Sequence, residues 1–315
     1  MSGTVLLLRL IWRRNAGLGA LYLLLLVLLA VYAWLHPGLL SVSGIARFTQ
    51  NWFPIALVAI AQTLVMLMGG IDLAVGAMVS LGCVLAATLV ADTLGGAALG
   101  GLAVVATGAA IGAATGAVVT LARLPAIIVT LAGSFLIGGA ALLVMPKPGG
   151  SMPAWLSDAL VGDVPTALVL FVVLLLLWRL LQATPLGHAI AAAGDNPQGA
   201  FRSGVPVTTA RIAAYAISGG LAGLAGVYVA AQTGAGDPVI GTPLTLDSIT
   251  AAVIGGVGFL GGQGTLRGAV AGSLLLAVLI NVMFFLGFPP VAQYVAKGLI
   301  IVVAMAVRIL REGRA

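Results

Sequence analysis

A single carboxylate stands in a glycine-rich break between two long apolar stretches. The break contains Gly69, Gly70 and Asp72, and the flanking stretches 52–68 and 73–91 carry no charged residue. An ionisable side chain in such surroundings is costly, so it usually has a structural or functional partner. Two interpretations of Asp72 have equal weight. Either it belongs with Gly69 and Gly70 to a translocation path or hinge, or it caps the helix that follows.

Lys297 is the other ionisable residue that falls inside an apolar stretch. Gln293 lies four residues earlier and shares its helix face, and no acid is obviously placed to pair with the lysine. We expect Lys297 to have a structural role, with its amine reaching the interface or an amide or carbonyl group inside the protein.

The residues needed for covalent chemistry or for metal binding are missing. Lys147 and Lys297 are the only lysines and neither completes a P-loop, so we expect no nucleotide to bind to this chain. No His-Glu-x-x-His or Gly-x-Ser-x-Gly pattern occurs. With Cys83 as the only cysteine and only His36 and His188 as histidines, we expect neither a disulfide nor a metal site. These absences argue against a membrane enzyme.

The composition defines the class of protein. Of 315 residues, 61% are hydrophobic and only 7% are charged, and the mean hydropathy is +1.21; soluble domains carry about 25% charged residues. Since a transmembrane helix needs about 20 mostly apolar residues, the sequence predicts an all-α, polytopic integral membrane protein. We expect one domain, residues 1–315, of about ten transmembrane helices in a tightly packed bundle.

The ten expected helices follow the apolar stretches. They are 18–35, 48–68, 73–91, 95–121, 124–145, 165–181, 211–231, 247–262, 266–287 and 291–308. The first is longer than the 7–15-residue core of a signal peptide, so we expect it to be retained. The segment 247–262 is short and glycine-rich, and it could be re-entrant instead of spanning.

The distribution of basic residues predicts the orientation, because cytoplasmic loops are enriched in lysine and arginine. With a cytoplasmic N-terminus, eleven basic residues fall inside: Arg9, Arg13, Arg14, Arg123, Arg179, Arg202, Arg211, Arg267, Arg308, Arg311 and Arg314. Only two, Arg47 and Lys147, fall outside, together with the acids Asp92, Asp158, Asp163, Asp237 and Asp247. Ten spans then place both termini in the cytoplasm. The basic residues form no patch with interleaved aromatics, so we expect no nucleic-acid partner.

Two connections are long. Residues 146–164 are rich in proline and glycine, and we expect an outer loop built from turns. Residues 182–210 form the largest cytoplasmic segment, where alanines predict a short helix, a break at 194–197 and a second turn or two of helix.

Glycines recur at four-residue spacing, which lets helix backbones approach closely in membranes. The two sets that we assign to helix packing are Gly108, Gly112 and Gly116, and Gly264, Gly268 and Gly272.

Five motifs in a fixed order carry a family resemblance. They are Gly-Gly-Ile-Asp-Leu-Ala-Val-Gly at 69–76, Arg123 followed by Thr130-Leu131, Leu186-Gly187 through Ser203-Gly204-Val205, Leu246-Asp247 through Gly255-Gly256, and Gly261-Gly262-Gln263-Gly264 with Gly268 and Gly272. From about residue 40 onward the chain resembles the membrane permease subunit of ribose-type ABC sugar importers, the inner-membrane component of binding-protein-dependent transport systems.

The resemblance implies a transport subunit that is not itself an enzyme. Its implied partners are an ATP-binding cassette subunit holding ATP and Mg, a periplasmic substrate-binding protein, a second permease copy or paralogue, and the lipid bilayer of a bacterial inner membrane. It also implies that the cytoplasmic segment 182–210 couples to the ATPase. The residues that we assign to this coupling segment are Leu186, Gly187, Gly194, Asp195, Asn196, Ala200, Ser203 and Gly204.

The chain departs from the family pattern at two places. Asp195 replaces a glycine, and the penultimate helix reads Ile280 to Phe284 where the family has several amides. If that helix lines the pathway, Asn281 and Phe284 join Asp72 as path candidates, and the cargo differs from ribose. A sister permease for nucleosides or branched-chain amino acids is the nearest alternative. An ion-coupled secondary carrier is less favoured, because such carriers need buried ionisable residues.

Overall fold

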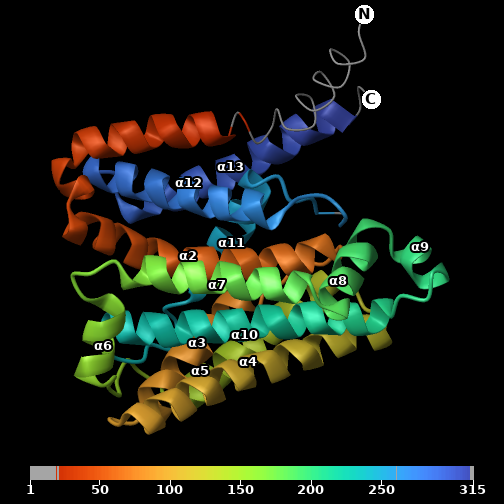
Figure 1. The fold of residues 1–315 in the computed structure, drawn as a ribbon, viewed down its shortest axis with the longest axis horizontal. Helices are drawn as coiled ribbons and strands as arrows, with labels where there is room; N and C mark the ends of the chain where they lie inside the picture. Colours follow the sequence, from red (N-terminus) through yellow and green to blue (C-terminus); the bar gives the residue numbers. More distant parts are fainter. Residues whose placement is uncertain (1–18, 20, 260, 313–315) are drawn as a thin grey trace, which may run out of the picture.

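The computed structural model describes residues 19, 21–259 and 261–312, with side chains described up to residue 303, and this part of the chain is all-helical. The long helices lie side by side, with one short helix at one end of the set and two at the other (Figure 1). The elements are a helix at Leu21–Leu35, η1 (Pro37–Leu40), α2 (Val42–Leu67), α3 (Val75–Leu89), α4 (Leu94–Leu121), α5 (Ala126–Val144), α6 (Ala154–Val161), α7 (Thr166–Gln182), α8 (Pro185–Asp195), α9 (Pro197–Arg202), α10 (Val207–Thr233), α11 (Thr242–Ile254), α12 (Leu266–Phe285) and α13 (Pro290–Glu312).

Five of these helices, α2, α4, α5, α10 and α12, are long and apolar enough to cross a membrane on their own. A sixth candidate is the pair formed by α6 and α7, which meet at an angle of 77°. The helix at Leu21–Leu35 together with α3, α11 and the described part of α13 is apolar but shorter. The described residues therefore establish a multi-pass helical protein with five or six candidate spans by length and composition. The expected start at residue 18 lies outside the described residues.

The largest shift from the expected boundaries concerns 247–262. The helix found there, α11, begins at Thr242 and ends at Ile254. Proline at position 243 suits the first turn of a helix, and Gly256 follows the end with a φ of 82°. At 13 residues and about 1.5 Å per residue, α11 is about 20 Å long. That is less than the roughly 30 Å thickness of a bilayer core.

The connection 146–164 contains more structure than turns alone. Residues 154–161 form α6, and Gly149 makes an isolated antiparallel bridge with Gly236. The indole Nε1 of Trp155 donates to Asp92 at 2.9 Å. The sequence missed α6 because Pro153 and Gly162, which look like turn residues, flank a helix of only eight residues.

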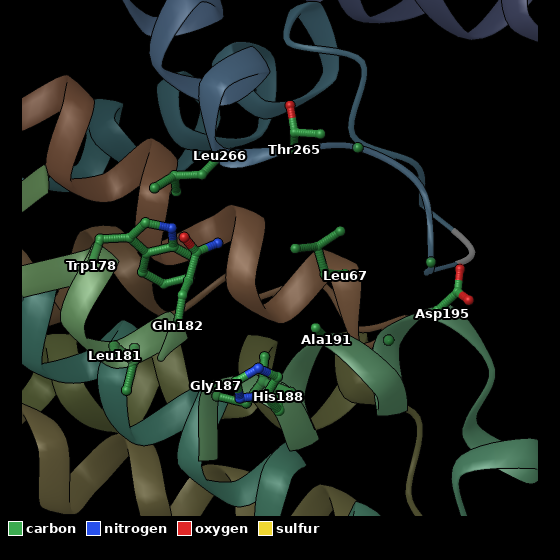
Figure 2. A pocket seen from close by; sticks show the side chains of 14 residues that line it. Leu67, Trp178, Leu181, Gln182, Gly187, His188, Ala191, Asp195, Thr265 and Leu266 are labelled. Carbon is green, nitrogen blue, oxygen red and sulfur yellow. The ribbon is translucent and has the colours of Figure 1, made fainter. Parts of the chain in front are cut away.

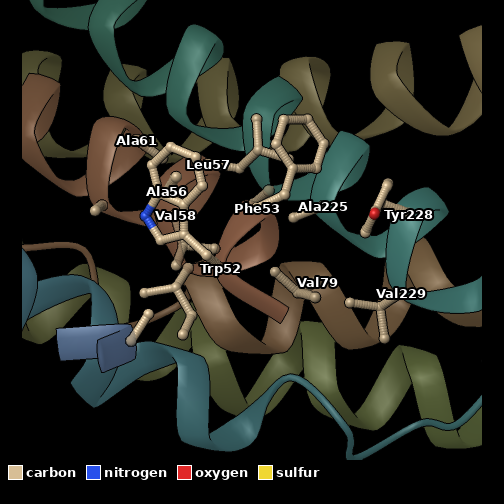
Figure 3. Packing of buried hydrophobic residues seen from close by; sticks show 14 of the residues in the cluster. Trp52, Phe53, Ala56, Leu57, Val58, Ala61, Val79, Ala225, Tyr228 and Val229 are labelled. Carbon is tan, nitrogen blue, oxygen red and sulfur yellow. The ribbon is translucent and has the colours of Figure 1, made fainter. Parts of the chain in front are cut away.

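Helix α2 lies at the centre of the core, with 89% of its most apolar 18-residue window buried. The rings of Phe53 on α2 and Tyr228 on α10 meet edge to face at 4.8 Å within this core (Figure 3). The indole of Trp52 donates to the hydroxyl of Ser273 on α12 at 3.0 Å. This bond pairs the two polar groups between helices, as an apolar surrounding requires.

The glycines of α4 face α10. A Cβ atom at Gly112 would overlap the carbonyl oxygen of Tyr215, and one at Gly108 would overlap that of Gly219. At Gly116 the nearest backbone atom of α10 would be only 3.0 Å away, at Ile212. This is the close backbone approach that small residues permit. In the second set, Gly268 and Gly272 lie against α11, whereas Gly264 lies in the turn before α12 with a φ of 118°.

Five arginines lie at the end of the bundle that carries α8 and α9. Arg202 lies in α9; the other four, Arg123, Arg179, Arg211 and Arg267, line or adjoin the cavities found at that end. Arg47 lies near the start of α2, at the opposite end. Residues Arg9, Arg13, Arg14 and Arg314 lie outside the described part of the chain, and the side chains of Arg308 and Arg311 are not described.

Candidate functional site

Helices α8 and α9 form a capped helix–turn–helix unit between α7 and α10. Thr184 caps α8 by accepting from the Gly187 N–H at 3.1 Å, and Asn196 ends α8 and caps α9 by accepting from the Gly199 N–H at 2.9 Å. Gly204 follows α9 with a φ of 82°, and its N–H donates to Phe201 at 3.0 Å, a typical glycine helix end. Gly187, Asn196 and Gly204, which the sequence singled out, therefore shape this unit.

The inward face of α8 is held by apolar contacts. Its buried side chains form a cluster with the end of α2 and the start of α10: Leu64, Met68, Ala189, Ile190, Ala193, Ala210 and Ala214. An alanine-rich helix outside the spans needs such a surface to pack on. Because the cluster joins α8 to two long helices, a displacement of α8 acts directly on both of them.

The end of α8, the end of α2 and the turn after residue 260 meet backbone to backbone. The Gly262 N–H donates to the Leu67 carbonyl oxygen at 3.0 Å. A Cβ atom at Gly194 would lie 3.0 Å from the same oxygen, and one at Gly262 would lie 2.9 Å from the Gly194 carbonyl oxygen. We call this contact of residues 67, 194 and 262 the glycine junction. It leaves no side chain between α8 and the break that follows α2.

Asp72 is buried and bonded on several sides. Its Oδ1 accepts from the Ala74 N–H at 2.9 Å, and its Oδ2 accepts from the Ser218 hydroxyl on α10 at 3.4 Å. The side-chain amide of Gln62, oriented to satisfy both groups, donates to the Asp72 carbonyl oxygen at 3.0 Å and accepts from its N–H at 3.2 Å. The hydroxyl of Thr130 donates to the Ile71 carbonyl oxygen at 2.9 Å. These bonds tie the break to α2, α5 and α10.

A cavity of about 350 Å³ lies beside α8 (Figure 2). Trp178 and Gln182 from α7, His188 and Asp195 from α8, and Leu266 at the start of α12 surround it. His188 Nδ1 lies 2.8 Å from the Thr184 carbonyl oxygen. The cavity leaves α8 without support on the side toward α12, so the helix has room to shift there.

Phe201 is the side chain that sequence reasoning missed. Its ring is 75% exposed on α9, and within 182–210, all of which the structure describes, no other large apolar side chain is exposed. The bundle faces that meet lipid expose many apolar groups, but α9 lies outside the candidate spans. An exposed aromatic at such a place is a typical contact residue. Its signal in the sequence was one phenylalanine among alanines, glycines and polar residues.

The structure does not bring the path candidates together. Asn281 lies on α12, where its Nδ2 donates to Ala277 and its Oδ1 accepts from the Tyr32 hydroxyl at 3.4 Å. Phe284 is 68% exposed beside Phe285, whose ring stacks on His36 near the start of α2. Gly69, Gly70 and Asp72 follow the other end of α2, a helix of 26 residues, or about 39 Å.

Lys297 has an acidic partner, contrary to the sequence-based expectation. Its amine lies 2.5 Å from Asp247 Oδ1, and both side chains are at most 7% exposed. The lysine also lies 5.4 Å from the ring centre of Tyr294. The expectation that Asp247 lies in an outer connection was wrong because α11 begins five residues before it and carries it into the protein. Fifty residues of sequence separate the two charges, so no local pattern pairs them.

Comparison with known proteins gives a consistent set of relatives. The family model described as "Branched-chain amino acid transport system / permease component" matches residues 44–305. The ribose import permease protein of Escherichia coli K12 is 34% identical over 90% of this chain and 91% of its own length. The D-allose transport system permease protein of the same strain is 30% identical over 90% of this chain and 89% of its own length. The galactose/methyl galactoside import permease protein of Salmonella typhimurium is 30% identical over 94% of this chain and 95% of its own length. No solved structure matches the chain.

Proposed function

The chain belongs to the branched-chain amino acid transport system permease family, and from this premise we propose that it is the membrane permease subunit of an ABC importer that takes up a sugar. The observation that carries the proposal is its similarity, along nine-tenths of its length, to permease proteins for ribose, allose and galactose. Like those proteins, it is a multi-pass inner-membrane transport component and not an enzyme in its own right.

We further propose that the chain crosses the membrane ten times, with both termini in the cytoplasm and all the helices in one domain. The five long apolar helices, the bent pair and the four shorter apolar helices supply ten candidates. The gathering of Arg123, Arg179, Arg202, Arg211 and Arg267 at the end with α8 and α9 supports placing that end in the cytoplasm.

The proposed mechanism assigns the unit of α8 and α9 to docking on the ATP-binding cassette subunit, which holds ATP and Mg. Exposed Phe201 offers that subunit an aromatic anchor. Movement of α8 is passed through the glycine junction to the break at Gly69, Gly70 and Asp72. There the bonds of Asp72 to Ala74 and Ser218 couple α3 to α10, so the helices shift as a set between outward and inward openings.

The remaining proposed partners are a periplasmic substrate-binding protein at the opposite end and a second permease, either a copy of this chain or a paralogue. The family description makes branched-chain amino acids the second candidate cargo, and nucleosides are a third. The curated relatives favour a sugar. Asn281 and Phe284 lie away from Asp72. The replacement of the family's amides in their helix therefore does not indicate a particular cargo.

The division of labour between subunits gives the first prediction. We expect the purified chain to hydrolyse no ATP, because it carries no P-loop. Reconstituted in lipid with its cassette subunit, it should support ATP hydrolysis that rises when sugar-loaded binding protein is added. Phosphate release measures both. If the rate of ATP hydrolysis in the full assembly does not change when loaded binding protein is added, the chain is not part of a binding-protein-dependent importer.

A further inference from the structure

A polar cavity of about 280 Å³ lies between the end of α4, the start of α5, the start of α10 and the turn after α2. Two arginines, Arg123 and Arg211, line it together with Thr120 and Tyr215. None of its ten lining residues, all in the described part of the chain, is acidic. The cavity therefore has a net positive lining.

Three buried hydrogen-bond donors in this lining have no protein partner among the described residues. They are the Tyr215 hydroxyl, the Thr120 hydroxyl and Nε of Arg211, and Tyr215 is only 1% exposed. Buried polar groups normally have a partner, because an unsatisfied one is destabilising. Asp72 is not the acceptor for these donors, because its carboxylate is already bonded to Ala74 and Ser218. Two arginines in a cavity without an acidic residue fit a negatively charged ligand with acceptor oxygens.

The backbone at Arg123 is strained. Its φ of 56° is the only positive value at a non-glycine residue in the described part of the chain, and an arginine adopts this left-handed conformation at an energetic cost. Such strain persists where the surroundings impose it, and it is concentrated at ligand sites. Arg123 lines the cavity together with Arg211.

An apolar groove adjoins the polar cavity. Leu124 lines both, and the groove continues for about 530 Å³ between α4 and α5. Of its 13 lining residues only Thr115 is polar; Val118, Ile128 and Leu136 are among the others. Helix α5 is largely uncovered, with 17% of its apolar window buried. A polar cavity with positive charge thus adjoins an apolar groove, and Leu124 lines both.

We propose that this composite site binds an anionic phospholipid, with the phosphate between Arg123 and Arg211 and an acyl chain in the groove between α4 and α5. Basic pockets between transmembrane helices on the cytoplasmic side recognise anionic head groups. The leaflet follows from the proposed orientation, in which this end of the bundle is cytoplasmic. The single negative charge of the phosphate is shared by the two arginines, a head-group oxygen accepts from the hydroxyl of Tyr215, and the lipid ties α4 and α10 to the turn before Asp72.

Lipid retention tests the proposal. The purified full-length chain is incubated with phosphatidylglycerol or with phosphatidylcholine of the same acyl chains, and bound lipid is counted by native mass spectrometry. We expect selective retention of phosphatidylglycerol. Each of Arg123→Gln and Arg211→Gln should weaken it about fivefold, and the double variant about 25-fold, at about 1 kcal/mol per basic residue. Tyr215→Phe removes one donor without changing the charge and should also lower retention.

Arg179→Gln is the matched control, because it removes an exposed arginine at the same end, on the last turn of α7, and should leave retention unchanged. Equal retention of the two lipids, or retention that the Arg123 and Arg211 variants do not alter, would overturn the proposal. So would displacement of the lipid by inorganic phosphate or glycerol phosphate alone, which would indicate a site for a free anion. A lipid-free dimer that covers α4 and α5 would also overturn it.

If the double variant fails to fold, the single variants and Tyr215→Phe decide the question. Since the assay needs no cassette subunit, its failure leaves the transport function untouched.

Discussion

Phe201→Asp is expected to abolish ATP-driven uptake while the protein still folds and inserts. The ring is 75% exposed on α9 and supports no part of the core. If α9 docks on the cassette subunit, a charge there replaces an apolar anchor at the interface. Aromatic residues at the centre of such interfaces contribute about 2 kcal/mol or more, so we expect the cassette subunit to bind about 30-fold more weakly. Co-purification of the cassette subunit and uptake in proteoliposomes measure the loss.

Val164→Asp provides the matched control, since Val164 is 66% exposed between α6 and α7 at the opposite end. It should leave co-purification unchanged. If the Phe201→Asp protein keeps the cassette subunit bound and transports normally, α9 is not part of the docking surface. A charge at Gly204 is a poorer test, because its φ of 82° would strain any side chain whatever it docks on.

Lys297→Met is expected to be strongly destabilising. The substitution removes the partner of Asp247 and leaves a buried carboxylate uncompensated. Breaking a buried ion pair in this way costs about 3–5 kcal/mol. We expect a lower midpoint of thermal unfolding in detergent and lower yield of inserted protein.

The double variant Asp247→Asn and Lys297→Met distinguishes the effect of losing the ion pair from the effect of leaving a buried carboxylate without a partner. With both charges gone, most of the stability should return, because well-packed neutral side chains often replace a buried pair without loss. If Lys297→Met alone unfolds at the wild-type temperature, the pair is not important for stability. If the double variant is as unstable as the single one, the uncompensated carboxylate is not the cause.

Local features of the chain were predictable. The residues that form α8 and α9 were expected as two short helices with a break at 194–197, and the structure has them with Asn196 at the break. The signals were local: the alanines of the first helix and the turn residues 194–197 at the break. The break at Gly69 and Gly70 was read from the sequence for the same reason. An all-helical, multi-pass protein followed from composition alone.

Features made by residues far apart in the chain were not predictable. Asp247 and Lys297 pair across fifty residues, and Arg123 and Arg211, nearly ninety residues apart, line one cavity. The glycine junction joins residue 67 to residues 194 and 262. Each contact depends on how helices pack, which periodicity along one helix does not specify. The exposure of Phe201 was not predictable for the same reason, since phenylalanine is more often buried than exposed.

The central claim is that this chain conducts a sugar across the membrane when a partner hydrolyses ATP, and uptake measures it most directly. Proteoliposomes holding the chain and its cassette subunit, with ATP inside and the binding protein outside, are given labelled ribose, allose, galactose or leucine. We expect at least one sugar to accumulate, with a requirement for ATP and the binding protein and no loss on addition of an uncoupler. Uptake that proceeds without ATP and collapses with the uncoupler would contradict it and indicate an ion-coupled carrier, while ATP-dependent uptake of leucine and no sugar would contradict the assigned cargo.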